Sequence, residues 1–135
     1  MGKLLAIDYG EKNIGTAISN ESKKLAFGLV VIDNRSKKYV LEQITEIVEE
    51  ENINKIIVGL PLGLNNKNTK QTNSVAEFIK VLKTNIEIEV VSIDERFTST
   101  LASKYMKGKK LKEKGELDIK AAQIILQNYL DKINN

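Results

Sequence analysis

The hydrophobic pattern of the chain changes near residue 38, and this change limits the possible folds more than any other feature of the sequence. The first third holds three short apolar runs separated by turns, which is typical of strands in an antiparallel meander. From residue 38 onward, segments with helical spacing of apolar residues alternate with short buried runs. Three strands followed by alternating helices and strands predict an α/β fold, with one mixed sheet and helices on both of its faces.

The patterns also give approximate bounds for the elements. We expect five strands (residues 3–9, 14–19, 25–32, 55–60 and 86–94), four helices (38–50, 74–82, 98–106 and 117–133) and two polar loops (63–71 and 108–115). The sequence contains no internal repeat and no segment with the composition of a linker. We therefore expect a single domain over residues 1–135.

The chain contains no cysteine and no histidine. Disulfides, thiolate catalysis, histidine-ligated zinc, serine–histidine–aspartate triads and histidine general bases are therefore excluded. Any chemistry near neutral pH must use carboxylates, lysines, hydroxyls or metals held by oxygen ligands.

Carboxylates stand at the ends of three predicted elements. Asp8 ends the first strand, Asp94 and Glu95 end the last strand, and Asp118 begins the last helix. Functional sites in open sheets form where strands end. If the first and last strands lie side by side, Asp8 comes close to one of the other strand-end acids. Strand alternation points Asp94 and Glu95 to opposite faces, so at most one of them is expected to face the cluster.

Three converging carboxylates form an oxygen-ligand site for one or two hard cations such as Mg²⁺ or Mn²⁺. Two such ions activate water and stabilise the leaving oxygen in phosphodiester hydrolysis. Each residue also has a simpler interpretation. Asp8 could be a turn residue, and Asp118 could cap a helix or complement its dipole. Gly10 and Gly15 alone are a weak signal for a phosphate-binding loop.

The net charge of +3 is concentrated in residues 101–115, which carry six lysines and one glutamate. This segment could be a solvated loop or a contact surface for a polyanion. The sequence shows neither a signal peptide nor an apolar run long enough to span a membrane, so a cytoplasmic location is expected.

Four segments together resemble the YqgF (RuvX-like) family: residues 6–19 (AIDYGEKNIGTAIS), 58–62 (VGLPL), 94–99 (DERFTS) and 118–127 (DIKAAQIILQ). They occur in the order of the family motifs and cover nearly the whole chain. The resemblance implies an RNase H-like fold and a nuclease activity linked to maturation of the 5′ end of 16S ribosomal RNA. An older interpretation of this family is a Holliday-junction resolvase.

Carried over by motif position, the resemblance implies that Asp8, Glu95 and Asp118 are the metal-binding catalytic carboxylates. Asp94 replaces Glu95 if the sheet register places it inward. The family motif usually has an arginine where this chain has Asn13, which removes one cation from the expected phosphate path.

The leading hypothesis is therefore a Mg²⁺- or Mn²⁺-dependent nuclease acting on structured RNA. The expected contacts to the nucleic-acid backbone are basic residues, namely Lys12, Arg96, Lys107, Lys109, Lys110 and Lys112. The alternatives are a DNA junction endonuclease and a non-catalytic RNA- or ribosome-binding protein of the same fold. Aromatic residues make up only 5% of the chain and tryptophan is absent, which argues against binding single strands by base stacking. Monomer and dimer remain open.

Overall fold

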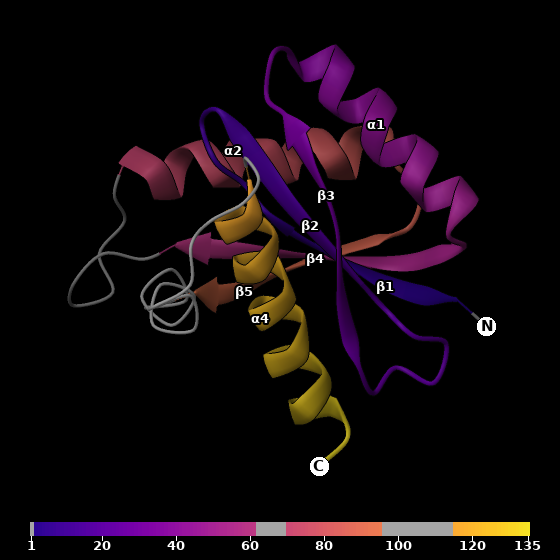
Figure 1. The fold of residues 1–135 in the computed structure, drawn as a ribbon. Helices are drawn as coiled ribbons and strands as arrows, with labels where there is room; N and C mark the ends of the chain where they lie inside the picture. Colours follow the sequence, from indigo (N-terminus) through magenta and orange to yellow (C-terminus); the bar gives the residue numbers. More distant parts are fainter. Residues whose placement is uncertain (1, 62–69, 96–114) are drawn as a thin grey trace.

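The computed structural model describes residues 2–61, 70–95 and 115–135, with Glu95 described by its backbone (Figure 1). One mixed sheet of five strands runs in the order β3-β2-β1-β4-β5. Its strands are β1 (Lys3–Asp8), β2 (Asn13–Ser19), β3 (Ala26–Asp33), β4 (Ile53–Pro61) and β5 (Glu89–Glu95). The strands β1, β2 and β3 form the predicted antiparallel meander, and β4 and β5 continue the sheet in parallel with β1.

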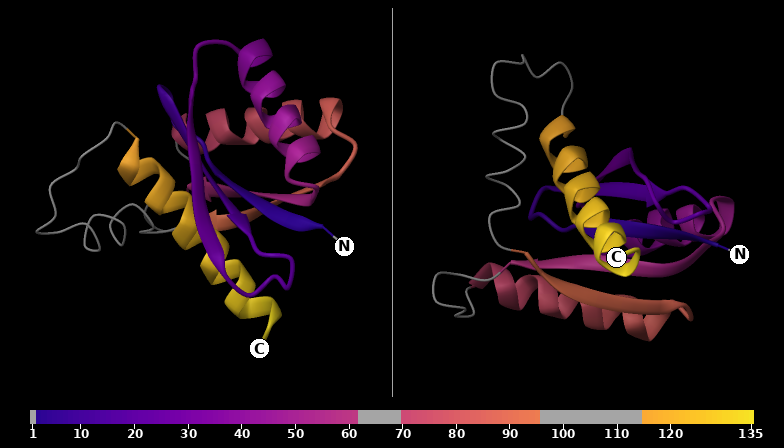
Figure 2. Two further views of the ribbon diagram at one scale, coloured as in Figure 1. Left: turned by 45° about the vertical axis from the view of Figure 1, so that its right-hand side comes forward. Right: turned by 90° about the horizontal axis from the view of Figure 1, so that it is seen from below.

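Helices cover both faces of this sheet, as the sequence predicts (Figures 1 and 2). The helices α1 (Lys37–Glu50) and α2 (Lys70–Asn85) pack on one face, and α4 (Glu116–Ile133) crosses the other. None of the helices in the described part of the chain combines the length and the apolarity that a membrane span requires.

The central strand β1 separates two hydrophobic cores by simple alternation of its side chains. Leu5 and Ile7 belong to the core under α1 and α2, whereas Leu4 and Ala6 belong to the core under α4. All four are almost fully buried. A strand covered on both faces needs a nearly continuous apolar run, which explains why this segment does not alternate in sequence.

The element bounds agree with the sequence patterns except near two loops. The helix α2 begins at Lys70, one turn earlier than its apolar spacing predicts, and the strand β5 begins at Glu89 instead of residue 86. The buried hydroxyl of Thr72 donates a hydrogen bond to the carbonyl of Pro61 and thereby fixes the first turn of α2 against β4. The helix expected at 98–106 lies outside the described residues, as does the lysine loop except for its last residue.

The sheet order corrects one expectation. The first and last strands are not neighbours, because β4 lies between them. Strand neighbours are about 4.8 Å apart, so the backbones of β1 and β5 are separated by about 10 Å. The helix α1 returns the chain to the free edge of β1, where β4 pairs, and α2 then leads to β5 on the outside. Any site that uses the ends of both β1 and β5 must therefore span β4.

Candidate active site

Asp8 is the last residue of β1 and lies on the face of the sheet that α4 covers. It follows Leu4 and Ala6 in the alternating series, and both of these side chains pack under α4. Asp8 is half-buried, in contrast to the fully buried residues before it. In the antiparallel ladder its partner on β2 is Gly15.

Gly15 brings the beginning of α4 close to Asp8. A Cβ atom on Gly15 would overlap the carbonyl oxygen and carbon of Asp118 and would lie 2.9 Å from the backbone nitrogen of Ile119. The backbone of Asp118 therefore rests directly on Gly15, which itself lies opposite Asp8. The structure thus brings Asp8 and Asp118 together at one end of the sheet. Gly15 is a residue of the strand β2, and the beginning of α4 packs against it.

Asp118 occupies the first turn of α4 but is not its N-cap. The N-cap is Gly115, with φ of 85°, and no side chain caps the helix there. Burial raises the pKa of the Asp118 carboxyl above its ordinary value. Desolvation disfavours the charged form of a carboxyl group, which is the cause of this shift. Such a carboxylate is stabilised in its charged form by a nearby cation, which makes this position a functional-site candidate.

The ladder between β4 and β5 distinguishes the two acids at the end of β5. Val91 and Ile93 pack in the core under α4, and residue 95 follows them in the alternating series. Asp94 has the opposite parity and is exposed. By alternation Asp94 differs in parity from Val91 and Ile93, and the choice of Glu95 over Asp94 stays a prediction. Ile7 pairs with Val58, so Asp8 lies at the level of the next residue of β4, Gly59. Gly59 pairs with Ile93, so the backbone of residue 95 lies two residues beyond the level of Asp8.

Some of the remaining predicted site residues lie within the described part of the chain, and others lie outside it. Among the described side chains, no group of three or more acids could hold a metal ion; Glu95 is not among those side chains. Lys12 is exposed in the turn after Asp8. The other expected phosphate contacts lie outside the described residues: Arg96, Lys107, Lys109, Lys110 and Lys112.

Asn34 positions the turn that follows Asp8, a role that sequence reasoning missed. Its side-chain amide donates a hydrogen bond to the carbonyl of Gly10 at 2.8 Å, and its backbone N–H donates to the carbonyl of Lys12 at 2.9 Å. These bonds hold the turn between β1 and β2 in one conformation. The available signal was an asparagine directly after a strand, a residue type that readily bonds to nearby backbone.

Two glutamines of α4 bond to β3 and so fix the orientation of the helix that carries Asp118. Gln123 donates to the carbonyl of Ala26 at 3.1 Å, and Gln127 accepts from the N–H of the same residue at 3.0 Å. Gln127 also donates to the carbonyl of Lys24 at 3.0 Å. The signal for this role was their spacing of four residues, which places both on one side of a helix.

Comparison with known protein families gives a match over nearly the whole chain. Residues 2–132 match the family model described as RuvX: Holliday junction resolvase. The chain is 39% identical over 137 residues to a protein of Sulfurihydrogenibium sp. (strain YO3AOP1) named "Putative pre-16S rRNA nuclease", covering 99% of this chain and 93% of that protein. A protein of Rickettsia conorii with the same name is 36% identical over 135 residues, covering 98% and 88%.

Solved structures of resolvases share the fold at low sequence identity. The Fowlpox virus resolvase in complex with Holliday junction DNA has a TM-score of 0.58 at 15% identity, covering 98% of this chain and 99% of that one. T. thermophilus RuvC in complex with a Holliday junction substrate has a TM-score of 0.57 at 11% identity, covering 98% of this chain and 96% of that one. These likenesses confirm the predicted RNase H-like fold.

Proposed function

Because this chain belongs to the RuvX family, we propose that it is a metal-dependent nuclease that cleaves phosphodiester bonds near the 5′ end of a 16S ribosomal RNA precursor. The names of the relatives at 36% and 39% identity support this substrate. The observation that carries the proposed mechanism is the close approach of Asp118 to the residue that pairs with Asp8. The proposal places the protein in the cytoplasm, in contact with precursor RNA or a precursor particle.

The donor set fits a hard divalent cation. Asp8, Glu95 and Asp118 would hold Mg²⁺ or Mn²⁺, since they supply oxygen ligands and the chain contains no histidine or cysteine. The raised pKa of Asp118 fits the same role, because a cation offsets the cost of keeping a partly desolvated carboxylate ionised. One or two bound ions would supply Lewis-acid activation of water and stabilisation of the leaving oxygen.

Residues around the proposed site determine its geometry and supply positive charge beside it. Gly15 lets the beginning of α4 approach β2 without a side chain between them, so that the backbone of Asp118 lies against the residue that pairs with Asp8. Asn34 holds the adjacent turn, which presents Lys12 to solvent beside Asp8. Lys12, Arg96 and the loop lysines would bind backbone phosphates without reading sequence.

Cleavage of a precursor RNA by the Asp8→Asn variant tests this function. We expect cleavage in Mg²⁺ to fall at least about a hundredfold, because metal stabilisation of the transition state contributes several kcal/mol. The matched control is Asp33→Asn, since Asp33 also ends a strand but is exposed and pairs with Arg35. Undiminished cleavage by Asp8→Asn would contradict the mechanism, whereas equal losses in both variants would indicate a general effect of removing an acid.

The same preparation distinguishes the two alternatives. The family description favours a DNA substrate, so a four-way DNA junction is assayed beside the RNA. Faster cleavage of the junction, by a symmetric dimer, would replace the RNA substrate with DNA. RNA binding that EDTA leaves unchanged, with no product in any divalent metal, would favour a non-catalytic binding protein.

A further inference from the structure

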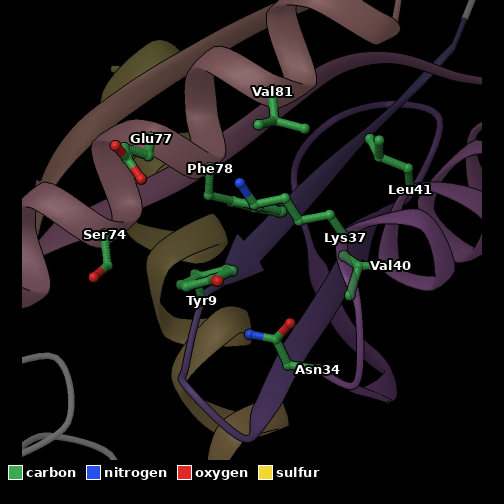
Figure 3. A pocket seen from close by; sticks show the side chains of 9 residues that line it. All are labelled: Tyr9, Asn34, Lys37, Val40, Leu41, Ser74, Glu77, Phe78 and Val81. Atoms are coloured by element: carbon green, nitrogen blue, oxygen red, sulfur yellow. The ribbon is translucent and has the colours of Figure 1, made fainter.

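A cavity of about 140 Å³ lies between α1, α2 and the end of β1 (Figure 3). It is on the opposite face of the sheet from Asp8, because Tyr9 packs with the core under α1 and α2. Its lining includes Tyr9 after β1, Asn34 after β3, Lys37 of α1, and Glu77 and Phe78 of α2. The carboxylate site does not use this cavity.

The cavity combines an aromatic floor with charged groups that lack partners. The rings of Tyr9 and Phe78 pack at a centroid distance of 4.4 Å, and Tyr9 remains only half-buried. Lys37 and Glu77 reach the cavity from the two different helices (Figure 3). Within the described part of the chain, neither charged side chain forms an ion pair or a hydrogen bond. A donor and an acceptor beside an aromatic ring are suited to a planar polar heterocycle.

The cavity is connected to the carboxylate site through consecutive backbone residues. Asp8 and Tyr9 are neighbours in sequence, so their Cα atoms are about 3.8 Å apart. Their side chains lie on opposite faces of the sheet. Asn34 lines the cavity and also holds the carbonyl of Gly10, the next residue along the chain. A nucleic-acid strand that bends around the end of β1 therefore meets the carboxylates on one side and the cavity on the other.

We propose that this cavity binds one unpaired pyrimidine base of the strand whose phosphate lies at Asp8 and Asp118, an inference that rests on the proposed nuclease function. A cavity of about 150 Å³ accommodates a single benzene-sized ring, so a one-ring base fits the 140 Å³ here better than a purine. Lys37 donates to a ring carbonyl, and Glu77 accepts from a ring or exocyclic N–H. Stacking of splayed bases on tyrosine or phenylalanine is a common mode of RNA recognition. The low aromatic content disfavours a long stacked strand, but one base needs only one aromatic platform.

Titration of the full chain with mononucleotides, followed by amide chemical shifts, tests this site without using cleavage. We expect saturable shifts with CMP and UMP at Tyr9, Asn34, Lys37 and residues 74–81. AMP should bind at least about tenfold more weakly, and ribose 5-phosphate should leave these amides unshifted. Equal shifts with ribose 5-phosphate would mean that only the phosphate is bound and would overturn the proposal, as would unshifted cavity amides with every nucleotide.

Variants at exposed lining residues separate this inference from the nuclease function. Glu77→Gln and Lys37→Gln should each weaken CMP or UMP binding about tenfold, since hydrogen bonds to charged groups are the stronger ones. They should raise KM for RNA while leaving kcat nearly unchanged. Lys38→Gln is the matched control, because Lys38 is exposed, adjacent in α1 and absent from the cavity lining. Unchanged pyrimidine binding in both lining variants would overturn the inference.

The Asp8→Asn variant completes the design. Pyrimidine binding at normal affinity by this variant, together with lost cleavage, supports both the cavity and the nuclease function. Retained cleavage by Asp8→Asn would overturn the nuclease mechanism while leaving the nucleotide titration as a separate result. Lost pyrimidine binding by Asp8→Asn would place the nucleotide at the carboxylates and would overturn the cavity assignment.

Discussion

The approach of Asp118 to Asp8 depends on Gly15, a residue without a side chain. The close contact is with backbone atoms of Asp118, which cannot rotate away as a side chain could. Gly28, on the neighbouring strand, also faces α4, but there an added Cβ would meet the side-chain atom Cγ2 of Ile119 at 2.5 Å. Substitutions at the two glycines therefore compare a clash with backbone, at Gly15, with a clash with a side chain, at Gly28.

Gly15→Ala should reduce both stability and cleavage. Overpacking against backbone typically costs about 1–3 kcal/mol, and moving the start of α4 also displaces Asp118 from Asp8. We expect Gly28→Ala to cost less and to retain more activity, because its added Cβ would meet a side-chain methyl group of Ile119 and not the backbone of Asp118. Urea denaturation and RNA cleavage of both variants measure this difference. Equal losses in the two variants would contradict the positioning role of Gly15.

Asp118→Asn should stabilise the metal-free protein at neutral pH while abolishing cleavage. The folded-state pKa of Asp118 is raised by burial, so the folded state binds this proton more tightly than the unfolded state. Stability from this group is therefore lost as pH rises from about 3.8, its ordinary pKa, through the raised folded-state pKa, and the penalty is complete above that pKa. Thermal melts should show a higher Tm for the variant at pH 7 and a vanishing difference below pH 3.8.

Magnesium should make the Tm of the wild type higher than that of Asp118→Asn. A cation that binds only the folded protein adds about 2.7 kcal/mol at a hundredfold excess over its Kd, so the Tm of the wild type should rise with Mg²⁺. The Tm of Asp118→Asn should rise much less, because one ligand is lost. Equal shifts in both proteins would show that Mg²⁺ stabilises the fold elsewhere.

Among the elements, α4 determines the geometry of the site because it carries Asp118 across the sheet. The apolar side of α4 packs against the sheet in one core, and Gln123 and Gln127 bond to Ala26 of β3. The backbone N–H and carbonyl of Ala26 are both occupied by these side chains. The helix therefore has one orientation in which these polar groups are all satisfied.

Gln127→Met should keep the size of the side chain but leave the Ala26 N–H without this acceptor. We expect a loss of about 1–3 kcal/mol in the free energy of unfolding, the usual cost of an unsatisfied buried donor. The control is Asn128→Ala on the same helix, since Asn128 is exposed and makes no side-chain hydrogen bond within the described residues. Urea denaturation measures both variants, and unchanged stability of Gln127→Met would contradict the role of this bond.

The helices and strands could be predicted from the sequence, whereas the pairing of the strands in the sheet could not. Hydrophobic periodicity depends only on which faces are buried, so it located β1 and α4 to within one residue. It carries no information about which strands pair, and the position of β4 between β1 and β5 became clear only from the ladder. The register of β5, and the contact of Gly15 with Asp118, follow from that pairing and were invisible to motif spacing alone.

At the level of the whole molecule, charge is divided between an acidic centre and a basic segment. The backbones of Asp8 and Asp118 come close at one end of the sheet, and the lysines between residues 101 and 115 precede α4 directly in sequence. Under the proposed function a polyanionic substrate would need both, since the cations would bind its backbone and the carboxylates would hold the metal.

Replacing Lys107, Lys109 and Lys110 together by glutamine should weaken RNA binding and flatten its salt dependence. Each lost phosphate contact lowers the slope of log affinity against log salt by about 0.7 for a single strand, so the slope should fall by about 2. The rate of cleavage at saturating RNA should change little. Binding isotherms at several salt concentrations measure the slope. The control is the same substitution at Lys38, Lys80 and Lys83, which are exposed on α1 and α2; an equal fall there would mean that only net charge matters.

The central claim is that Asp8, Glu95 and Asp118 hold a divalent cation at the end of the sheet. A crystal soaked in Mn²⁺ tests it most directly, because manganese gives anomalous difference density at its own position. We expect a peak in contact with the carboxylates of Asp8 and Asp118, with Glu95 as the third protein ligand and Asp94 directed away. A peak bound by Asp94 in place of Glu95 would contradict the predicted choice of Glu95. The absence of any peak between Asp8 and Asp118 would contradict the metal site itself.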